Sequence, residues 1–142
     1  MTGGADNGAG LASAALALIG APYRLHGRNP ATGLDCIGLL DAALRACSKA
    51  SRLPTGYRLR SRVVPEVSGL AGSHGFTSVA GPTAVGDVLL VRTGPCQLHL
   101  LIAADARRFV HAHAGLRRVV CDQVPETWPI LHHWRLAREI EV

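Results

Sequence analysis

The segment Leu34-Asp35-Cys36-Ile37-Gly38-Leu39-Leu40 decides the fold, because it predicts the start of an amphipathic helix. We expect the helix to begin at Asp35 or Cys36 and to end at about Cys47. With Cys36 as the origin and about 100° per residue, the same side of the helix carries Leu40, Ala43, Leu44 and Cys47. Cys36 therefore lies in the first turn and faces the core.

A cysteine in the first turn of a helix is well placed to act as a nucleophile. A free thiol has a pKa of about 8.5, so only a small fraction is thiolate at neutral pH. The partial positive charge of the helix N-terminus favours the thiolate, and the free N–H of Cys36 can help to hold an oxyanion. A buried structural cysteine explains this segment equally well when it is taken alone.

The spacing of the cysteines argues against disulfides and zinc. Cys36 and Cys47 lie on one predicted helix, about 16 Å apart, which is far beyond the roughly 7 Å Cα limit for a disulfide. The sequence contains no Cys-x-x-Cys pair, so a structural zinc site is not expected. We expect Cys47, Cys96 and Cys121 to be small buried hydrophobic residues.

The rest of the chain predicts helices first and strands afterwards. Residues 1–7 are expected to form a flexible tail. A first helix covers about Leu11 to Leu18, and 21–33 form a loop. Residues 48–85 are expected to be irregular, with one short helix near 65–70. Strands are predicted over 88–92, 98–103, 108–112, 117–121 and 130–136. This order predicts one α+β domain over 1–142, with N-terminal helices and the Cys36 helix packed on a C-terminal antiparallel sheet.

Two histidines on the predicted strands are candidates for a base that serves Cys36. His99 begins a strand, so its ring should lie at the end of the sheet. A hairpin loop at 104–106 pairs His99 with His111, whereas a loop at 105–107 pairs it with His113. The residues alone leave both registers open, and either one supplies a second ring to orient His99. A metal site of Cys36 and these three histidines is a weaker alternative, because no carboxylate is evident beside them.

Composition narrows the range of partners. The formal net charge is +5, and Lys and Arg together number 15. The basic residues form no long run and few aromatics accompany them, so no nucleic-acid partner is expected. A polyanionic surrounding such as a cell wall fits the charge, and so does a solvated basic surface. The apolar stretch from Leu11 to Ile19 is too short to span a bilayer and has no basic residue before it. We therefore expect synthesis in the cytoplasm without a signal peptide and no membrane insertion.

The motifs resemble those of the NlpC/P60 family of papain-like cysteine peptidases. The resemblance covers about residues 11–136, and the twelve-residue step from His99 to His111 is similar to the family's spacing. The matching pieces are Gly20-Ala21-Pro22-Tyr23-Arg24, Gly33-Leu34-Asp35-Cys36-Ile37-Gly38-Leu39, Gly86-Asp87-Val88-Leu89-Leu90, His99-Leu100-Leu101-Ile102 and Phe109-Val110-His111-Ala112.

The resemblance implies a role for each of these positions. Cys36 would be the nucleophile, His99 the general base and His111 the orienting residue, which favours His111 over His113 in the choice of register. Substrate would be bound by Tyr23, Asp35, Ile37 and His113, and no cofactor or metal is implied. The implied activity is hydrolysis of peptidoglycan stem peptides through a thiolate–imidazolium pair that is lost at low pH.

The residues of these motifs are most similar to those of the prophage and gene-transfer-agent tail branch of the family. This implies tail-like partners and delivery to the periplasmic wall. Ile37 stands where many members have Ser, and Leu25-His26-Gly27 replaces the usual Trp-Gly or Gly-Gly. The alternatives are a tail component that binds the wall without cutting it and a related thiol amidase or acyltransferase.

Overall fold

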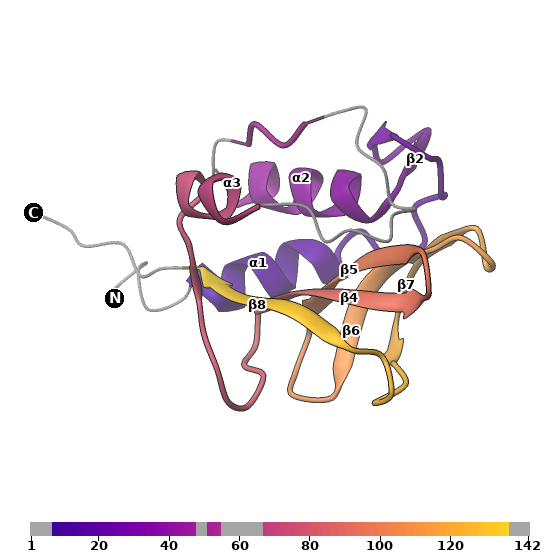
Figure 1. The fold of residues 1–142 in the computed structure, drawn as a ribbon. Helices are drawn as coiled ribbons and strands as arrows, with labels where there is room; N and C mark the ends of the chain where they lie inside the picture. The colour runs from indigo at the N-terminus through magenta and orange to yellow at the C-terminus, as the bar shows by residue number, and fades with distance from the viewer. Residues whose placement is uncertain (1–6, 48–50, 55–66, 137–142) are drawn as a thin grey trace, which may run out of the picture.

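The computed structural model describes residues 7–47, 51–54 and 67–136. Its two longer helices precede most of its strands in the chain, as the sequence predicts (Figure 1). The helices are α1 (Asn7–Leu16), α2 (Cys36–Ala46) and α3 (Ser68–Ser73). The strands are β1 (Arg28–Asn29), β2 (Gly33–Leu34), β3 (Phe76–Ser78), β4 (Val88–Gly94), β5 (Gln97–Ala103), β6 (Arg108–His113), β7 (Arg118–Gln123) and β8 (Ile130–Leu136).

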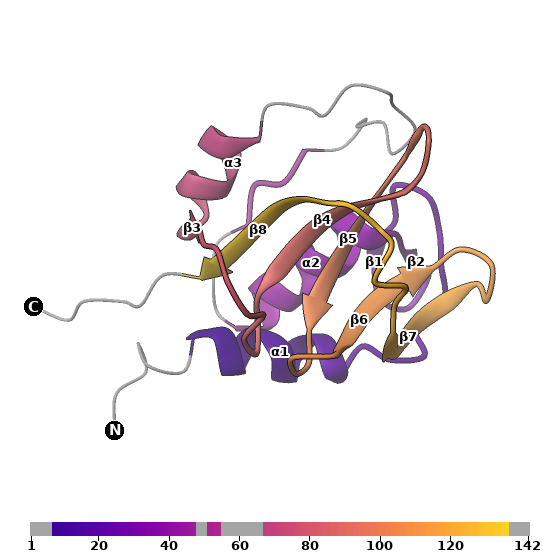
Figure 2. The ribbon, with the colours of Figure 1, turned by 60° about the horizontal axis from the view of Figure 1, so that its bottom comes forward.

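Strands β3 to β8 form one antiparallel sheet in the order β3-β8-β4-β5-β6-β7 (Figure 2). The five predicted strands are confirmed within one or two residues. Strand β3 was missed because it is only three residues long and forms by pairing with β8, where Phe76 lies opposite Leu136. The two-residue strands β1 and β2 were missed for a similar reason, since each is too short to show an alternating pattern.

The two faces of the large sheet are covered differently. On one face α1 and α2 pack against the strands, and their core includes Leu11, Leu39 and Leu44 together with Leu100 and Val110. The other face carries a smaller cluster, against which Val124 and Trp128 pack. This second cluster consists of Leu89, Val91, Leu101, Ala103 and Phe109. Because side chains alternate along a strand, His99 and His111 belong to the second face.

Asp35 sets the start of α2, as the sequence predicts. It is the N-cap, and its Oδ1 accepts a hydrogen bond from the backbone N–H of Gly38 at 2.8 Å. Its Oδ2 accepts a second one from the N–H of His26, also at 2.8 Å. A Cβ at Gly38 would overlap with the carbonyl oxygen of Gly27. The carboxylate and the absent side chain together bring the loop before α2 against its first turn.

The remaining predicted elements agree in part. Helix α1 begins at Asn7, so the tail predicted over residues 1–7 is one residue too long at that end, and its other residues lie outside the described part. Helix α3 begins later than the helix expected near 65–70, and 65–66 are not described. None of the helices in the described ranges has the length and hydropathy needed to cross a membrane.

Candidate active site

A pocket of about 700 Å³ lies where the first turn of α2 meets the ends of β5 and β6. It contains Cys36, His99 and His111, which the sequence singled out as a nucleophile, a base and an orienting residue. The other lining residues are Tyr23, Leu25, His26, Thr93, Gln97, Leu98, Ala112, His113, Ala114, Gly115 and Trp128. Residues that are far apart in the chain therefore line one concave site.

Cys36 lies beside β5, on the side of that strand that faces β6. The N–H of Ala103 points toward β4, where it donates to the carbonyl oxygen of Asp87. By alternation, the N–H of Leu100 points toward β6. The pairing of β5 with β6 ends at Ile102 and Val110, so Leu100 has no partner on β6. Its N–H instead lowers the pKa of the Cys36 thiol, so it faces the sulfur.

The histidine relay, which consists of His99, His111 and Asp122, extends from the pocket to the surface. Nε2 of His99 lies 2.9 Å from Nδ1 of His111. Nε2 of His111 lies 2.7 Å from Oδ1 of Asp122. The side chain of His111 is 4% exposed and that of Asp122 is 47% exposed. The edge-to-face contact of His99 with Trp128 closes one side of the relay, with ring centroids 6.3 Å apart.

Burial dominates the acid–base properties of the pair that faces the pocket. Burial raises the pKa of the Cys36 thiol to about 12, with a further contribution from Asp35 against the hydrogen bond from Leu100. Burial together with His111 and His113 lowers the pKa of His99 to about 3, against the opposing charge of Asp122. Both shifts favour the neutral thiol and the neutral imidazole in the free protein.

The register between β5 and β6 corrects one sequence prediction. Ala103 pairs with Phe109 and Ile102 with Val110, which is the register that would place His99 opposite His113. The resemblance favoured the other register because it favoured His111. His111 is nevertheless the ring bonded to His99, because the pairing stops before His99 and imidazole rings can reach a diagonal neighbour.

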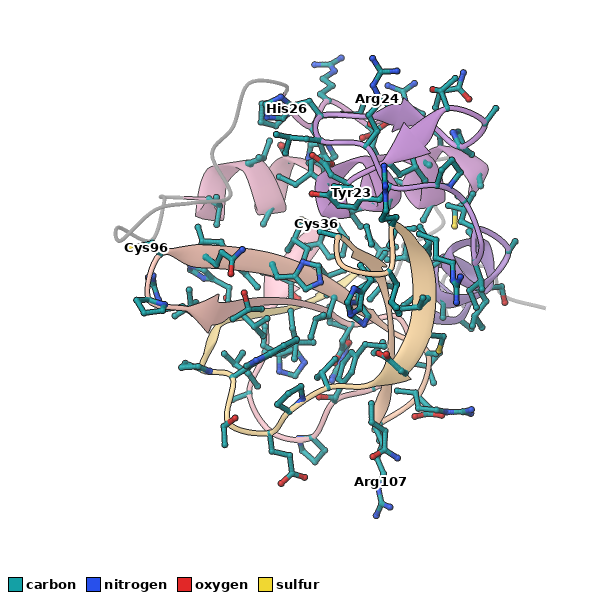
Figure 3. All side chains as sticks on the ribbon, turned by 90° about the vertical axis from the view of Figure 1, so that its right-hand side faces the viewer. Tyr23, Arg24, His26, Cys36, Cys96 and Arg107 are labelled. Carbon is teal, nitrogen blue, oxygen red and sulfur yellow. The ribbon has the colours of Figure 1, made fainter. Side chains whose placement is uncertain are left out.

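The residues predicted to bind substrate occupy different positions. Tyr23 lines the pocket beside Cys36 (Figure 3), and burial, Cys36 and Asp35 raise the pKa of its hydroxyl. His113 also lines the pocket, and its Nδ1 accepts a hydrogen bond from the N–H of Leu116 at 3.0 Å. Ile37 packs against the helix-side core and is not among the pocket-lining residues.

Asp35 is fully buried, and both of its oxygens accept backbone hydrogen bonds. It positions the loop that carries Tyr23 and His26, and it does not line the pocket. Direct binding of substrate by Asp35 stays a prediction.

Sequence reasoning missed two residues of the site, Asp122 and Trp128. The predicted strand ended at Cys121, one residue before Asp122. The turn around Gly115 pairs His113 with Arg118 and His111 with Val120, which makes Asp122 a diagonal neighbour of His111. The position of that turn in the sequence could therefore have predicted that Asp122 lies near His111. Trp128 lies in the connection from β7 to β8, and no local pattern marks it.

All four cysteines are free thiols, and only Cys36 is buried. Cys47, Cys96 and Cys121 are partly exposed, so they are not the buried residues that the sequence predicts. Figure 3 shows Cys96 at the tip of the hairpin from β4 to β5. Within the described ranges, no group of three or more His, Cys, Asp or Glu side chains is arranged to hold a metal ion.

No protein-family model matches the sequence, and no curated protein matches it. Solved structures match it at low identity. NlpC2 from Trichomonas vaginalis has a TM-score of 0.65 and 18% identity over 91% of this chain and 46% of its own. The chain therefore spans just under half the length of that protein.

Two further structures match over almost their whole length. The NlpC/P60 domain of the peptidoglycan hydrolase SagA has a TM-score of 0.60 and 24% identity, over 87% of this chain and 96% of its own. The P60 domain of an antigen from M. avium subspecies paratuberculosis has a TM-score of 0.54 and 16% identity over 98% of both chains. The chain therefore has an α+β, NlpC/P60-like fold, with its N-terminal helices packed on a six-stranded antiparallel sheet.

Proposed function

We propose that the protein is a cysteine peptidase that hydrolyses amide bonds in peptidoglycan stem peptides, of the γ-D-glutamyl-diaminopimelate type. The observation that carries this proposal is the meeting of Cys36 with the histidine relay in one pocket. A thiol, a base and a group that orients the base are the parts that nucleophilic amide hydrolysis requires. The likeness of the fold to the peptidoglycan hydrolase SagA supports the choice of substrate.

Acylation begins with the neutral pair. Nε2 of His99 is engaged by His111, so Nδ1 is the ring nitrogen that takes the proton from the thiol of Cys36. The sulfur attacks the amide carbonyl as this proton moves, and a tetrahedral oxyanion forms. The N–H of Cys36 in the first turn of α2 stabilises the oxyanion. Nδ1–H of His99 then protonates the leaving amine, the C–N bond breaks, and a thioester remains.

Deacylation reverses the roles. Neutral His99 accepts a proton from water, and the resulting hydroxide attacks the thioester carbonyl. The C–S bond breaks, and the proton on His99 returns to the sulfur of Cys36. One water is consumed for each amide bond, and the enzyme regains its neutral pair.

The walls of the pocket suit a short peptide. A volume of about 700 Å³ is in the range of small-ligand sites. Leu25, Leu98 and Trp128 supply apolar surface, while the Tyr23 hydroxyl and the ring of His113 supply polar groups beside the nucleophile. Ile37 offers no polar group where a serine could, so we propose that Tyr23 and His113 make the polar contacts to the substrate.

We also propose that a phage-tail or gene-transfer-agent particle delivers the enzyme to the periplasmic wall. This proposal rests on the similarity of the motif residues to those of the tail branch of the family. Mass spectrometry of purified particles from the source organism tests it: the intact protein is expected in the particle fraction, and its absence there would contradict delivery without bearing on hydrolysis.

The decisive experiment incubates the purified protein with peptidoglycan and identifies the released fragments by mass spectrometry. Wild type is expected to release stem-peptide fragments, and Cys36→Ala is expected to lose at least about 10³-fold of this activity. Cys47→Ala is the matched control, because it removes a thiol from the end of the same helix, away from the pocket.

Each other outcome is informative. Release by Cys36→Ala at the wild-type rate would overturn Cys36 as the nucleophile. No release by wild type, with both proteins retained on sedimented wall, would replace the proposal with a binding module. Fragments cut at a different amide bond would retain the chemistry and replace the γ-D-glutamyl assignment.

A further inference from the structure

We propose that Asp122 is a positioning residue that sets the direction of the hydrogen bonds in the histidine relay, so that Nδ1 of His99 is left unprotonated to act as the base. The inference rests on the proposed function for its catalytic meaning. The hydrogen-bond direction itself can be measured without any substrate.

The carboxylate of Asp122 forms the outer end of the histidine relay. An ionised carboxylate only accepts hydrogen bonds, so Nε2 of His111, at 2.7 Å from Oδ1, must carry the proton. A neutral imidazole has one N–H, so Nδ1 of His111 is then an acceptor. At 2.9 Å from this acceptor, Nε2 of His99 must be the donor. The single N–H of neutral His99 is thereby used, and its Nδ1 keeps a lone pair.

The opposite direction would disable the base. If Nε2 of His111 were an acceptor, its Nδ1 would donate to Nε2 of His99, and Nδ1 of His99 would carry the proton. That tautomer cannot take a proton from Cys36. The two directions place the same atoms at the same distances, so what distinguishes them is the chemistry of the group at the outer end of the relay.

The surroundings make Asp122 the deciding group. The side chain of His111 is 4% exposed, so water has little access to it, whereas the Asp122 side chain is 47% exposed and keeps a solvated charge. The same charge opposes the depression of the pKa of His99, so it also favours the imidazolium that forms during acylation. Asp122 does not line the pocket, which makes it a residue that acts through His111.

The test combines a tautomer measurement with kinetics. In protein labelled with ¹⁵N-histidine, two-dimensional NMR at neutral pH identifies which ring nitrogen carries the proton. In wild type, His99 and His111 are both expected as Nε2–H tautomers. Asp122→Asn can either accept or donate, so the Nδ1–H tautomers are expected to appear for both rings. Its kcat for release of peptidoglycan fragments is expected to fall about 10-fold, with little change in KM. This is less than the roughly 10⁴-fold loss for a buried orienting aspartate in a hydrolase triad, because water can reach Asp122.

Two further variants serve as controls. Asp122→Glu keeps an acceptor-only carboxylate, so it is expected to retain the wild-type tautomers and most of the activity. Glu126→Gln removes one charge from the exposed connection after β7 and is expected to change neither. Circular dichroism establishes that each variant is folded.

The outcomes separate this inference from the proposed function. An Nδ1–H tautomer at either ring in wild type, or tautomers in Asp122→Asn identical to those in wild type, would overturn the role of Asp122. An unchanged kcat in Asp122→Asn would overturn it as well. If wild type releases no fragments but shows both Nε2–H tautomers that Asp122→Asn loses, the positioning role holds and the peptidase assignment fails.

Discussion

Two aspartate–histidine pairs lie on the same face of the sheet, one at the start of β4 and on β8 and the other on β6 and β7, and they differ in which partner is buried. Oδ2 of Asp87 lies 2.6 Å from Nε2 of His133, and Oδ1 of Asp122 lies 2.7 Å from Nε2 of His111. In the first pair the aspartate is 0% exposed, whereas in the second the histidine is 4% exposed and the aspartate is largely in solvent.

The partners of each carboxylate explain this difference. Asp87, His133 and Arg135 form the Asp87 cluster. Asp87 accepts hydrogen bonds from Nε and Nη2 of Arg135 at 2.8 and 2.9 Å, and from the N–H of Ala84 at 2.9 Å. Burial alone would raise the pKa of Asp87, but these donors and His133 lower it overall. The Asp87 cluster is thus a saturated ion pair that ties the start of β4 to β8.

Unlike the Asp87 cluster, the histidine relay is not neutralised by a cation in the described part of the chain and is not closed off from its surroundings. One end reaches solvent through Asp122 and the other reaches the pocket through His99, with no arginine among its hydrogen-bond partners in the described residues. The comparison teaches that the same pair of residue types holds the fold together when its charges are neutralised and buried. An aspartate–histidine pair can instead carry a proton when its histidine ring faces a pocket.

The largest expected effect separates the two histidines by activity. His99→Ala should lower the rate of fragment release about 10³-fold, because the base is lost. His133→Ala should leave the rate within about twofold, because its ring contacts Asp87 and not the pocket. Fragment release measured by mass spectrometry, with circular dichroism as a check of folding, decides the matter. Equal losses of activity in both variants would contradict the distinction between a catalytic His99 and a structural His133.

The next effect separates the two aspartates by stability. Asp87→Asn should lower the free energy of unfolding by about 3 kcal/mol. The neutral asparagine would leave the Arg135 guanidinium and the backbone N–H of Ala84 without their charged acceptor. Asp122→Asn should lower the free energy of unfolding by less than about 0.5 kcal/mol, because its carboxylate is half-exposed. Urea titrations at neutral pH measure both values. A larger loss for Asp122→Asn would show that the relay is structural.

The smallest effect separates the two regions by pH. The folded pKa of His99, about 3, lies below its ordinary value of 6.5, so the unfolded chain binds the proton first as the pH falls. Its contribution to stability is complete above pH 6.5 and is lost toward pH 3, at about 1.4 kcal/mol per pH unit. Asp87 has a lowered pKa, so its contribution is lost only below its ordinary value of 3.8.

Urea titrations from about pH 7 to about pH 5 should therefore show a loss of about 2 kcal/mol that His99→Gln reduces. Asp87→Asn should leave this slope unchanged while lowering the whole curve. A slope that is the same in wild type and His99→Gln would contradict the lowered pKa of His99.

Local sequence was sufficient for much of the fold and for the start of α2. The start of the helix at Asp35 or Cys36 and its apolar side depend on positions three or four residues apart, which one helix determines by itself. The five longer strands were found for the same reason, since alternation is a local pattern. Strand β3 depends on a distant partner, β8, and β1 and β2 are only two residues each, so no local pattern marked them.

The sequence by itself thus determined which side chains could serve as nucleophile and base, and on which elements they lie. The tertiary structure decided how they meet. The early end of the pairing between β5 and β6 joins His99 to His111 in a register that would have selected His113, and Asp122 completes the relay from β7. Burial in the folded protein also shifts the pKa of Cys36 and that of His99 toward their neutral forms. The physical reason is that helix-end electrostatics are local, whereas desolvation depends on everything that packs around a group.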